Sequence, residues 1–136
     1  MGPTTLYIAD EHDTVRNALA EYLERAMNLT VIGHTGDAEK VLRDIRKEKP
    51  DIVLVEVKRT DGLGLEIVRQ ISTLPDPPQL IVLTSYPSSW EEEAASRAGA
   101  TAYLLKDINS EKLLQSITEL AGASEGSSVG SNTPST

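Results

Sequence analysis

Four short apolar segments of this chain end in side chains that could do chemistry. The first ends at the carboxylates of Asp10 and Glu11, and a later one ends at Glu56. The other two end at the hydroxyl of Thr84 and the ammonium of Lys106. Each of these side chains, taken alone, is most simply a solvated or locally paired group. Their joint occurrence at the ends of apolar segments predicts one shared site.

Three carboxylates that converge in such a site need a compensating positive charge or a proton. Two unit charges about 4 Å apart interact by roughly 4 kcal/mol at an effective dielectric constant near 20. A hard divalent cation with oxygen ligands would relieve the repulsion. The ammonium of Lys106 would do so as well, and so would a carboxyl group that stays protonated. The residues alone leave these three solutions open.

The pattern of apolar residues predicts the elements that position these side chains. Strands are predicted at residues 6–9, 29–34, 52–55, 80–83 and 100–105. Helices are predicted at residues 14–27, 38–49, 65–73, 88–98 and 110–121, with Asp13 and Asp37 as N-caps of the first two. This alternation specifies an α/β fold with a doubly wound, five-stranded parallel sheet of the flavodoxin-like (βα)5 type, strand order 2-1-3-4-5. In such sheets ligand sites lie at the carboxyl ends of the strands.

Length and composition limit the classes of function. A chain of 136 residues is enough for one domain, which we place at residues 1–122; the Ser- and Gly-rich residues 123–136 are predicted to be a disordered tail or the stub of a linker. The net charge of −8 argues against a nucleic-acid-binding surface in this chain. No segment has the pattern of a membrane span or a signal peptide, and there is no cysteine, so a cytoplasmic protein is expected.

Two other site chemistries are weakly supported. A flavodoxin-like enzyme or FMN binder would need a phosphate-binding loop after the first strand, but Asp10 and Glu11 occupy that position and would repel a phosphate. His12 and His34 lack the spacing of a metal-binding pair, and lone histidines are more often surface or capping residues.

From about Leu6 to Ala121 the chain resembles the receiver domains of two-component response regulators, the CheY-like superfamily. The residues of the first and last matching motifs, at 8–12 and 98–107, are most similar to those of receivers in NarL/LuxR-type DNA-binding response regulators. The motifs that carry the resemblance are the segments at residues 8–12, 50–56, 64–66, 81–85 and 98–107. The resemblance implies a signalling module, not an enzyme, with a histidine kinase as a candidate partner.

The resemblance also implies a phosphoryl and metal site. In the family a histidine kinase phosphorylates an Asp at the end of the third strand, and Mg²⁺ is bound there. Carried over by position, Glu56 occupies the phospho-acceptor position. Glu11, Glu56 and the backbone carbonyl of Lys58 would bind Mg²⁺, and Asp10 would bind it through a water molecule.

Three further positions would form the switch. By the same resemblance Thr84 would bind a phosphoryl oxygen and Lys106 would neutralise the phosphoryl group. Tyr103 would be the aromatic residue that swings inward on activation. Positioning and cationic stabilisation of this kind are what phosphoryl transfer requires.

The chain departs from the family at the acceptor, where Glu56 replaces Asp. One added methylene moves the carboxylate by about 1.5 Å, a displacement that costs on the order of 100-fold in a positioned reaction. The longer side chain also brings its charge toward Lys106, which partly imitates a phosphorylated state. Thr60 replaces the usual loop proline and Leu63 a common Asp. Mg²⁺ binding is therefore expected to be weak or absent; a natural variant and an engineered substitution would leave the same residue.

Two functional hypotheses follow. The first is an atypical receiver that keeps the fold and the switch surface but does not accept phosphate at Glu56. The alternative is a partner-docking or dimerisation scaffold without a phosphorelay role, or the regulatory domain of a truncated DNA-binding regulator. Family dimers commonly use the fourth helix, fifth strand and fifth helix, and the predicted fourth helix carries Trp90 and Arg97, residue types enriched in interface hot spots.

Overall fold

The computed structural model describes residues 2–108 and 111–130, with side chains up to residue 122. The strands are β1 Thr4–Ala9, β2 Leu29–Thr35, β3 Ile52–Val55, β4 Gln79–Thr84 and β5 Ala102–Leu105. The helices are α1 Asp13–Glu24, α2 Ala38–Glu48, α3 Gly64–Ser72, α4 Ser89–Ala98 and α5 Glu111–Gly130. In the described residues no helix is long and apolar enough to cross a membrane.

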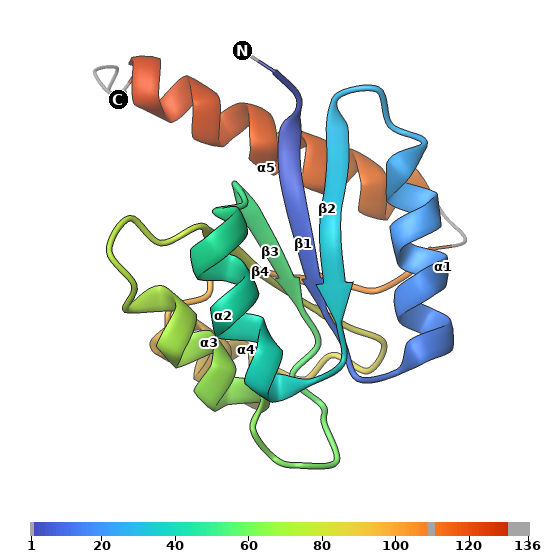
Figure 1. The fold of residues 1–136 in the computed structure, drawn as a ribbon, viewed down its shortest axis with the longest axis vertical. Coiled ribbons are helices and arrows are strands. Elements are labelled where there is room, and N and C mark those ends of the chain that lie inside the picture. Colours follow the sequence, from blue (N-terminus) through green and yellow to red (C-terminus); the bar gives the residue numbers. More distant parts are fainter. Residues whose placement is uncertain (1, 109–110, 131–136) are drawn as a thin grey trace.

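The five strands form one parallel sheet in the order β2-β1-β3-β4-β5, which confirms the predicted topology. Helices α1 and α5 cover one face, and α2, α3 and α4 cover the other (Figure 1). Alternate residues of each strand point to opposite faces. On β3, Ile52 and Leu54 pack under α1 and α5, whereas Val53 and Val55 pack under α2 and α3. A strand buried on both faces therefore delivers the residue that follows it to the centre of the carboxyl edge.

Helix α1 begins one residue earlier than predicted. Its N-cap is His12, which makes no side-chain capping bond, and Asp13 lies in the first turn, where it pairs with Arg16 at 2.8 Å. The predicted N-cap at Asp13 is thus wrong. The cause is a turn in which the Asp10 carboxylate accepts the His12 N–H, so that the chain enters the helix sooner.

Helix α5 continues to Gly130, eight residues past the domain boundary predicted at residue 122. A glycine such as Gly122 inside a helix costs only about 1 kcal/mol relative to alanine, so it does not end the helix by itself. Residues 131–136 of the predicted tail lie outside the described residues.

One glycine fixes the loop that leaves β3. A Cβ on Gly64, the first residue of α3, would lie 2.0 Å from the Val57 carbonyl oxygen. Only glycine therefore allows the start of α3 to pack directly against the chain that follows β3. This contact holds residues 56–63 close to the carboxyl edge of the sheet.

Candidate functional site

The centre of the carboxyl edge is an ion-paired cluster around Lys106. The ammonium lies 2.5 Å from Asp10 Oδ2 and 3.0 Å from Glu56 Oε1. All three side chains are at most 5 % exposed. Since a buried charge is tolerated only when it is paired, each carboxylate depends on this one lysine. Of the three solutions to the repulsion, the structure places the lysine between the two carboxylates.

Asp10 is further held by the turn that follows β1. Its Oδ1 accepts a hydrogen bond from the His12 N–H at 2.9 Å, and His12 Nδ1 lies 3.0 Å from the same oxygen. Burial alone would raise the pKa of Asp10, but the hydrogen bonds from Lys106 and His12 outweigh it and lower that pKa below its usual value. Asp10 is therefore a buried, ionised carboxylate.

Both carboxylate oxygens of Glu56 are engaged. Oε1 pairs with Lys106, and Oε2 accepts the backbone N–H of Lys58 at 3.0 Å. The Glu56 backbone N–H donates to Ala9 at 3.0 Å, which continues the β1–β3 ladder by one residue. The side chain is thus fixed at both ends within the edge of the sheet.

Glu11 does not join this cluster. Its Oε1 accepts the Thr60 N–H at 2.7 Å, and its Oε2 accepts the Thr60 hydroxyl at 2.6 Å. The hydrogen bond from the Thr60 hydroxyl is the main cause that lowers the pKa of Glu11. Both oxygens of Glu11 are therefore directed to the β3–α3 loop, and the carboxylate is occupied there.

A second ammonium, that of Lys58, lies beside the first cluster. Its Nζ donates to the Thr84 hydroxyl at 2.8 Å and to the Tyr86 carbonyl at 2.9 Å. It also pairs with Glu91 of α4, at 2.7 Å from Oε1 and 2.9 Å from Oε2. The hydroxyl of Thr84, at the end of β4, is thus already bound to a cation.

Tyr103 of β5 connects to the same carboxylate. Its hydroxyl donates to Glu91 Oε1 at 2.6 Å and accepts the Ser88 N–H at 3.1 Å. Burial is the main cause that raises the pKa of Tyr103, and the hydrogen bond to Glu91 adds to it. A chain of contacts therefore runs from Thr84 through Lys58 and Glu91 to Tyr103.

The structure brings together most of the residues that the sequence singled out. The side chains of Asp10, Glu56 and Lys106 are in contact. The backbone N–H of Lys106 donates to the backbone carbonyl of Thr84 at 2.7 Å. Sequence reasoning assigned Lys58 only a role for its backbone carbonyl and missed the role of its ammonium. It also missed Glu91, which lies in the first turn of α4. The Ser-x-x-Glu spacing of residues 88–91, a capping-box pattern, was the available signal.

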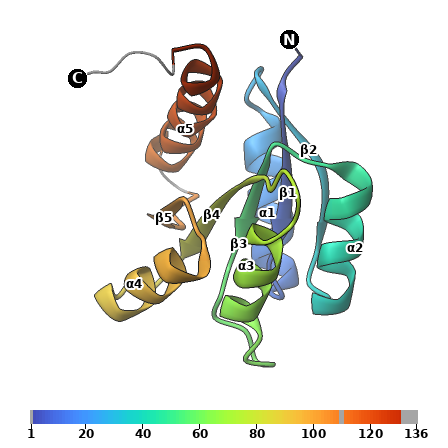
Figure 2. The ribbon, with the colours of Figure 1, turned by 90° about the vertical axis from the view of Figure 1, so that its left-hand side faces the viewer.

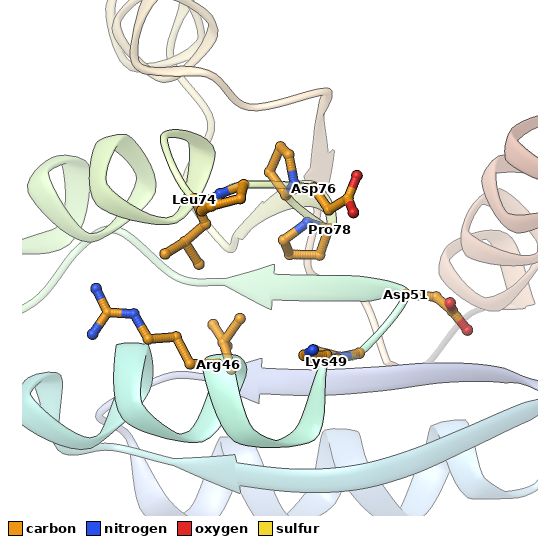
Figure 3. Close-up of a pocket in the computed structure, with 10 residues that line it drawn as sticks. Arg46, Lys49, Asp51, Leu74, Asp76 and Pro78 are labelled. Carbon is orange, nitrogen blue, oxygen red and sulfur yellow. The ribbon is translucent and has the colours of Figure 1, made fainter.

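The opposite, amino end of the sheet carries a cavity of about 710 Å³ between α2 and the loop that leads into β4. It is lined by Ile45, Arg46, Lys49, Pro50, Asp51, Leu74, Pro75, Asp76, Pro77 and Pro78. In Figure 3 the carboxylates of Asp51 and Asp76 point away from the space between these two segments. Asp51 accepts the Thr5 N–H at 2.8 Å. The lining thus combines two basic and two acidic residues with apolar and proline side chains.

Comparison with protein families matches residues 6–118 to the response regulator receiver domain. This match covers most of the chain and includes both lysine clusters. The chain therefore belongs to the receiver domain family of two-component response regulators, as its motifs predicted.

The curated relatives include transcriptional regulators. The chain is 31 % identical over 116 residues to the DNA-binding transcriptional activator DevR/DosR of Mycobacterium tuberculosis, covering 85 % of this chain and 53 % of that protein. It is also 31 % identical over 110 residues to the transcriptional regulatory protein LiaR of Bacillus subtilis, covering 81 % of this chain and 52 % of that protein. The chain thus spans about half the length of the curated relatives it matches.

Solved structures agree on the fold. A two-component response regulator of the LuxR family from Aurantimonas sp. SI85-9A1 superposes with a TM-score of 0.81 at 24 % identity, covering 90 % of this chain and 87 % of that one. A CheY-like receiver domain protein from Methanospirillum hungatei JF-1 gives a TM-score of 0.79 at 25 % identity, covering 91 % and 98 %. The neighbours in sequence and structure include NarL/LuxR-type response regulators, as predicted.

Proposed function

We propose that this chain is an atypical receiver module that signals without accepting a phosphoryl group at Glu56. The observation that carries the proposal is the placement of Lys106 between Asp10 and Glu56, at 2.5 and 3.0 Å. The cation that would neutralise an added phosphoryl group is already neutralised by two buried carboxylates. The site as it stands therefore already uses its central cation before any phosphoryl group is added.

The geometry of Glu56 also disfavours attack on a phosphodonor. A nucleophilic carboxylate needs a free oxygen in line with the donor. One oxygen of Glu56 is held by Lys106 and the other by the Lys58 N–H. One of these bonds would have to break first, and loss of the second would leave the partly buried Lys58 N–H without this acceptor.

The residues expected to bind Mg²⁺ do not fit the ion in this arrangement. Asp10 and Glu56 share Lys106, and Glu11 is held by Thr60. Among the described residues no group of three or more His, Cys, Asp or Glu side chains is arranged to hold a metal ion. We propose that Mg²⁺ binds weakly or not at all, which calorimetric titration would test against the Glu56→Asp variant.

A histidine kinase and a DNA-binding output domain are the proposed partners in the signalling pathway. Receiver domains work with histidine kinases, and two curated relatives, each roughly twice as long as the matched region, are DNA-binding or transcriptional regulators. We propose that this receiver is the cytoplasmic regulatory part of such a system. The net charge of −8 makes direct binding of nucleic acid by these residues unfavourable.

Phosphodonor assays test the acceptor proposal. With acetyl phosphate and Mg²⁺, intact-mass analysis should find the unmutated protein unmodified, and beryllofluoride with Mg²⁺ should leave its NMR spectrum unchanged. Glu56→Asp should restore measurable modification, whereas the Glu56→Gln control should not. A stoichiometric, acid-labile phosphate on Glu56 of the unmutated protein would end this proposal.

A dimerisation scaffold is the second candidate, because large apolar side chains are exposed along one edge. Tyr86, Trp90 and Leu105 are 76 %, 72 % and 51 % exposed. They lie around α4 and β5, the edge strand, with α5 beside it (Figure 2). Light scattering over a concentration series should then show a dimer that Trp90→Ala weakens. Met27→Ala, which removes an exposed side chain after α1, is the control; a monomer at all concentrations would refute the scaffold.

A further inference from the structure

The ammonium of Lys58 joins three segments that are distant in the sequence. Lys58 lies in the loop after β3, Thr84 ends β4, and Glu91 lies in the first turn of α4. All four acceptor atoms, from Thr84, Tyr86 and Glu91, lie within 2.9 Å of Nζ. An ammonium has three N–H donors, so these contacts use its whole capacity for hydrogen bonding. The single ammonium of Lys58 therefore accounts for the contact between these three segments.

Glu91 requires this cation. The residue is buried, and its Oε1 accepts hydrogen bonds from both Lys58 and Tyr103. A buried carboxylate without a positive partner is strongly unfavourable. The α4 segment can therefore place Glu91 against the sheet only while an ammonium is present beneath it.

The first turn of α4 contains an altered capping box. In the usual motif the glutamate accepts the N–H of the N-cap residue. Here the Ser88 hydroxyl accepts the Glu91 N–H at 3.1 Å, as a cap does. The Ser88 N–H, however, donates to the Tyr103 hydroxyl, and that hydroxyl donates to the Glu91 carboxylate. The tyrosine hydroxyl is thus inserted between the two members of the motif. The orientation of Tyr103 and the start of α4 are set together.

We propose that Lys58 is the positioning residue of α4: its ion pair with Glu91 holds the first turn of that helix and the Tyr103 ring in place without any phosphoryl group. The exposed Trp90 lies one residue before Glu91 and belongs to the surface so positioned. This inference does not depend on whether Glu56 accepts phosphate.

The ion pair between Lys58 and Glu91 also connects Thr84, at the end of β4, to the surface of α4. The Lys58 ammonium that holds Glu91 is the one that occupies the Thr84 hydroxyl. An anion that bound at Thr84 would draw the ammonium toward itself and loosen its bonds to Glu91, because the three donors are already in use. The position of α4 would then report the occupancy of the site through a single side chain.

Hydrogen exchange measured without any phosphodonor tests this inference. The amides to follow are those of Glu91 and Glu92, which donate to Ser88. Lys58→Met should speed their exchange by about tenfold or more, since charge-assisted hydrogen bonds hold the turn. Lys58→Arg should restore most of the protection. The emission of Trp90, the only tryptophan of the chain, should shift in parallel.

Arg97→Met is the matched control. It removes one positive charge from α4 itself, but Arg97 pairs with Glu93 at 3.4 Å between two exposed side chains. It should leave the exchange of the first turn unchanged. Equal exchange in the Lys58→Met and Arg97→Met variants would overturn the inference.

The unmutated protein gives a second test in case Lys58→Met does not fold. Raising NaCl from 0.1 to 1 M should speed exchange at Glu91 and Glu92 by about threefold or more, because the Lys58 side chain is 40 % exposed and its charge is screened. The amides of β3 should not respond. Exchange that is independent of salt would count against the Lys58–Glu91 ion pair as the contact that holds the first turn of α4. A phosphorylated Glu56 would refute the proposed function and leave this result intact.

Discussion

The two lysines at the carboxyl edge of the sheet hold similar partners in different environments. Lys106 is 5 % exposed and lies between Asp10 and Glu56, both buried. Lys58 is 40 % exposed and pairs with Glu91 of α4, whose side chain is only 10 % exposed. Both make contacts of 3.0 Å or less, so distance alone does not separate them.

What separates them is what remains when the lysine is removed. The partners of a buried lysine cannot return to water, so its loss leaves uncompensated buried charge. A half-exposed lysine stays in contact with water, so its pair is partly screened and its net value is smaller than that of a pair buried on both sides. The Lys106 cluster is therefore suited to fix the structure, and the Lys58 cluster is suited to change.

The largest expected effect is that of Lys106→Met. Because Asp10 and Glu56 would stay buried without a cation, the free energy of unfolding at pH 7 should fall by about 3–5 kcal/mol in urea titrations. Lys47→Met, at an exposed position of α2, is the control and should change it by less than about 0.5 kcal/mol. A loss below about 1 kcal/mol for Lys106→Met would remove the distinction between the two lysines.

Acid should weaken the Lys106 cluster. The pKa of Asp10 is lowered in the folded protein, so below the unfolded value of about 3.9 the unfolded chain binds the proton first. The stabilisation by Asp10 is complete above that value and is lost as the pH falls through the lower folded pKa. Asp10→Asn should reduce the slope of unfolding free energy against pH below pH 4 by up to about 1.4 kcal/mol per unit. An unchanged slope would mean that Asp10 is not ionised.

Lys58→Met should cost less. Lys58 is 40 % exposed whereas Glu91 is only 10 % exposed, so we expect a loss of about 1–2 kcal/mol in unfolding free energy. Lys58→Met combined with Glu91→Gln should cost less than the sum of the two single changes, because neither change matters once the pair is absent. Additive losses would show that the two side chains do not interact energetically.

Salt should give the smallest and most selective effect. Between 0.1 and 1 M NaCl the Debye length falls from about 10 to about 3 Å. The cost of Lys58→Met should shrink by a few tenths of a kcal/mol, whereas the cost of Lys106→Met should stay constant because its partners are buried. Equal salt dependence in the two variants would contradict the comparison.

The sequence predicted the fold and the centre of the site because both depend on local patterns. Apolar runs and helical periodicity placed all ten elements, and a parallel sheet necessarily collects the residues that end its strands. Asp10, Glu56 and Lys106 meet for that reason. These three residues directly follow β1, β3 and β5, so the order of the strands is enough to predict that they lie near one another.

The outer contacts could not be predicted, because they depend on long side chains that can turn either way. Glu11 follows Asp10 directly but turns toward Thr60, whose N–H and hydroxyl outcompete the centre of the site. Lys58 similarly reaches across to α4 instead of into solvent. Sequence order says where such a residue begins, but the positions of its partners decide where its charge lies.

The hydrogen bonds between Thr60 and Glu11 make the availability of Glu11 depend on the residue at position 60. A proline at position 60 could make neither bond, since it lacks both the N–H and the hydroxyl. Exchanging Glu56 for Asp would thus free the acceptor while Glu11 stayed bound to the loop. A change at position 56 and a change at position 60 therefore act on different carboxylates of the site, and only the second would release Glu11 from the loop.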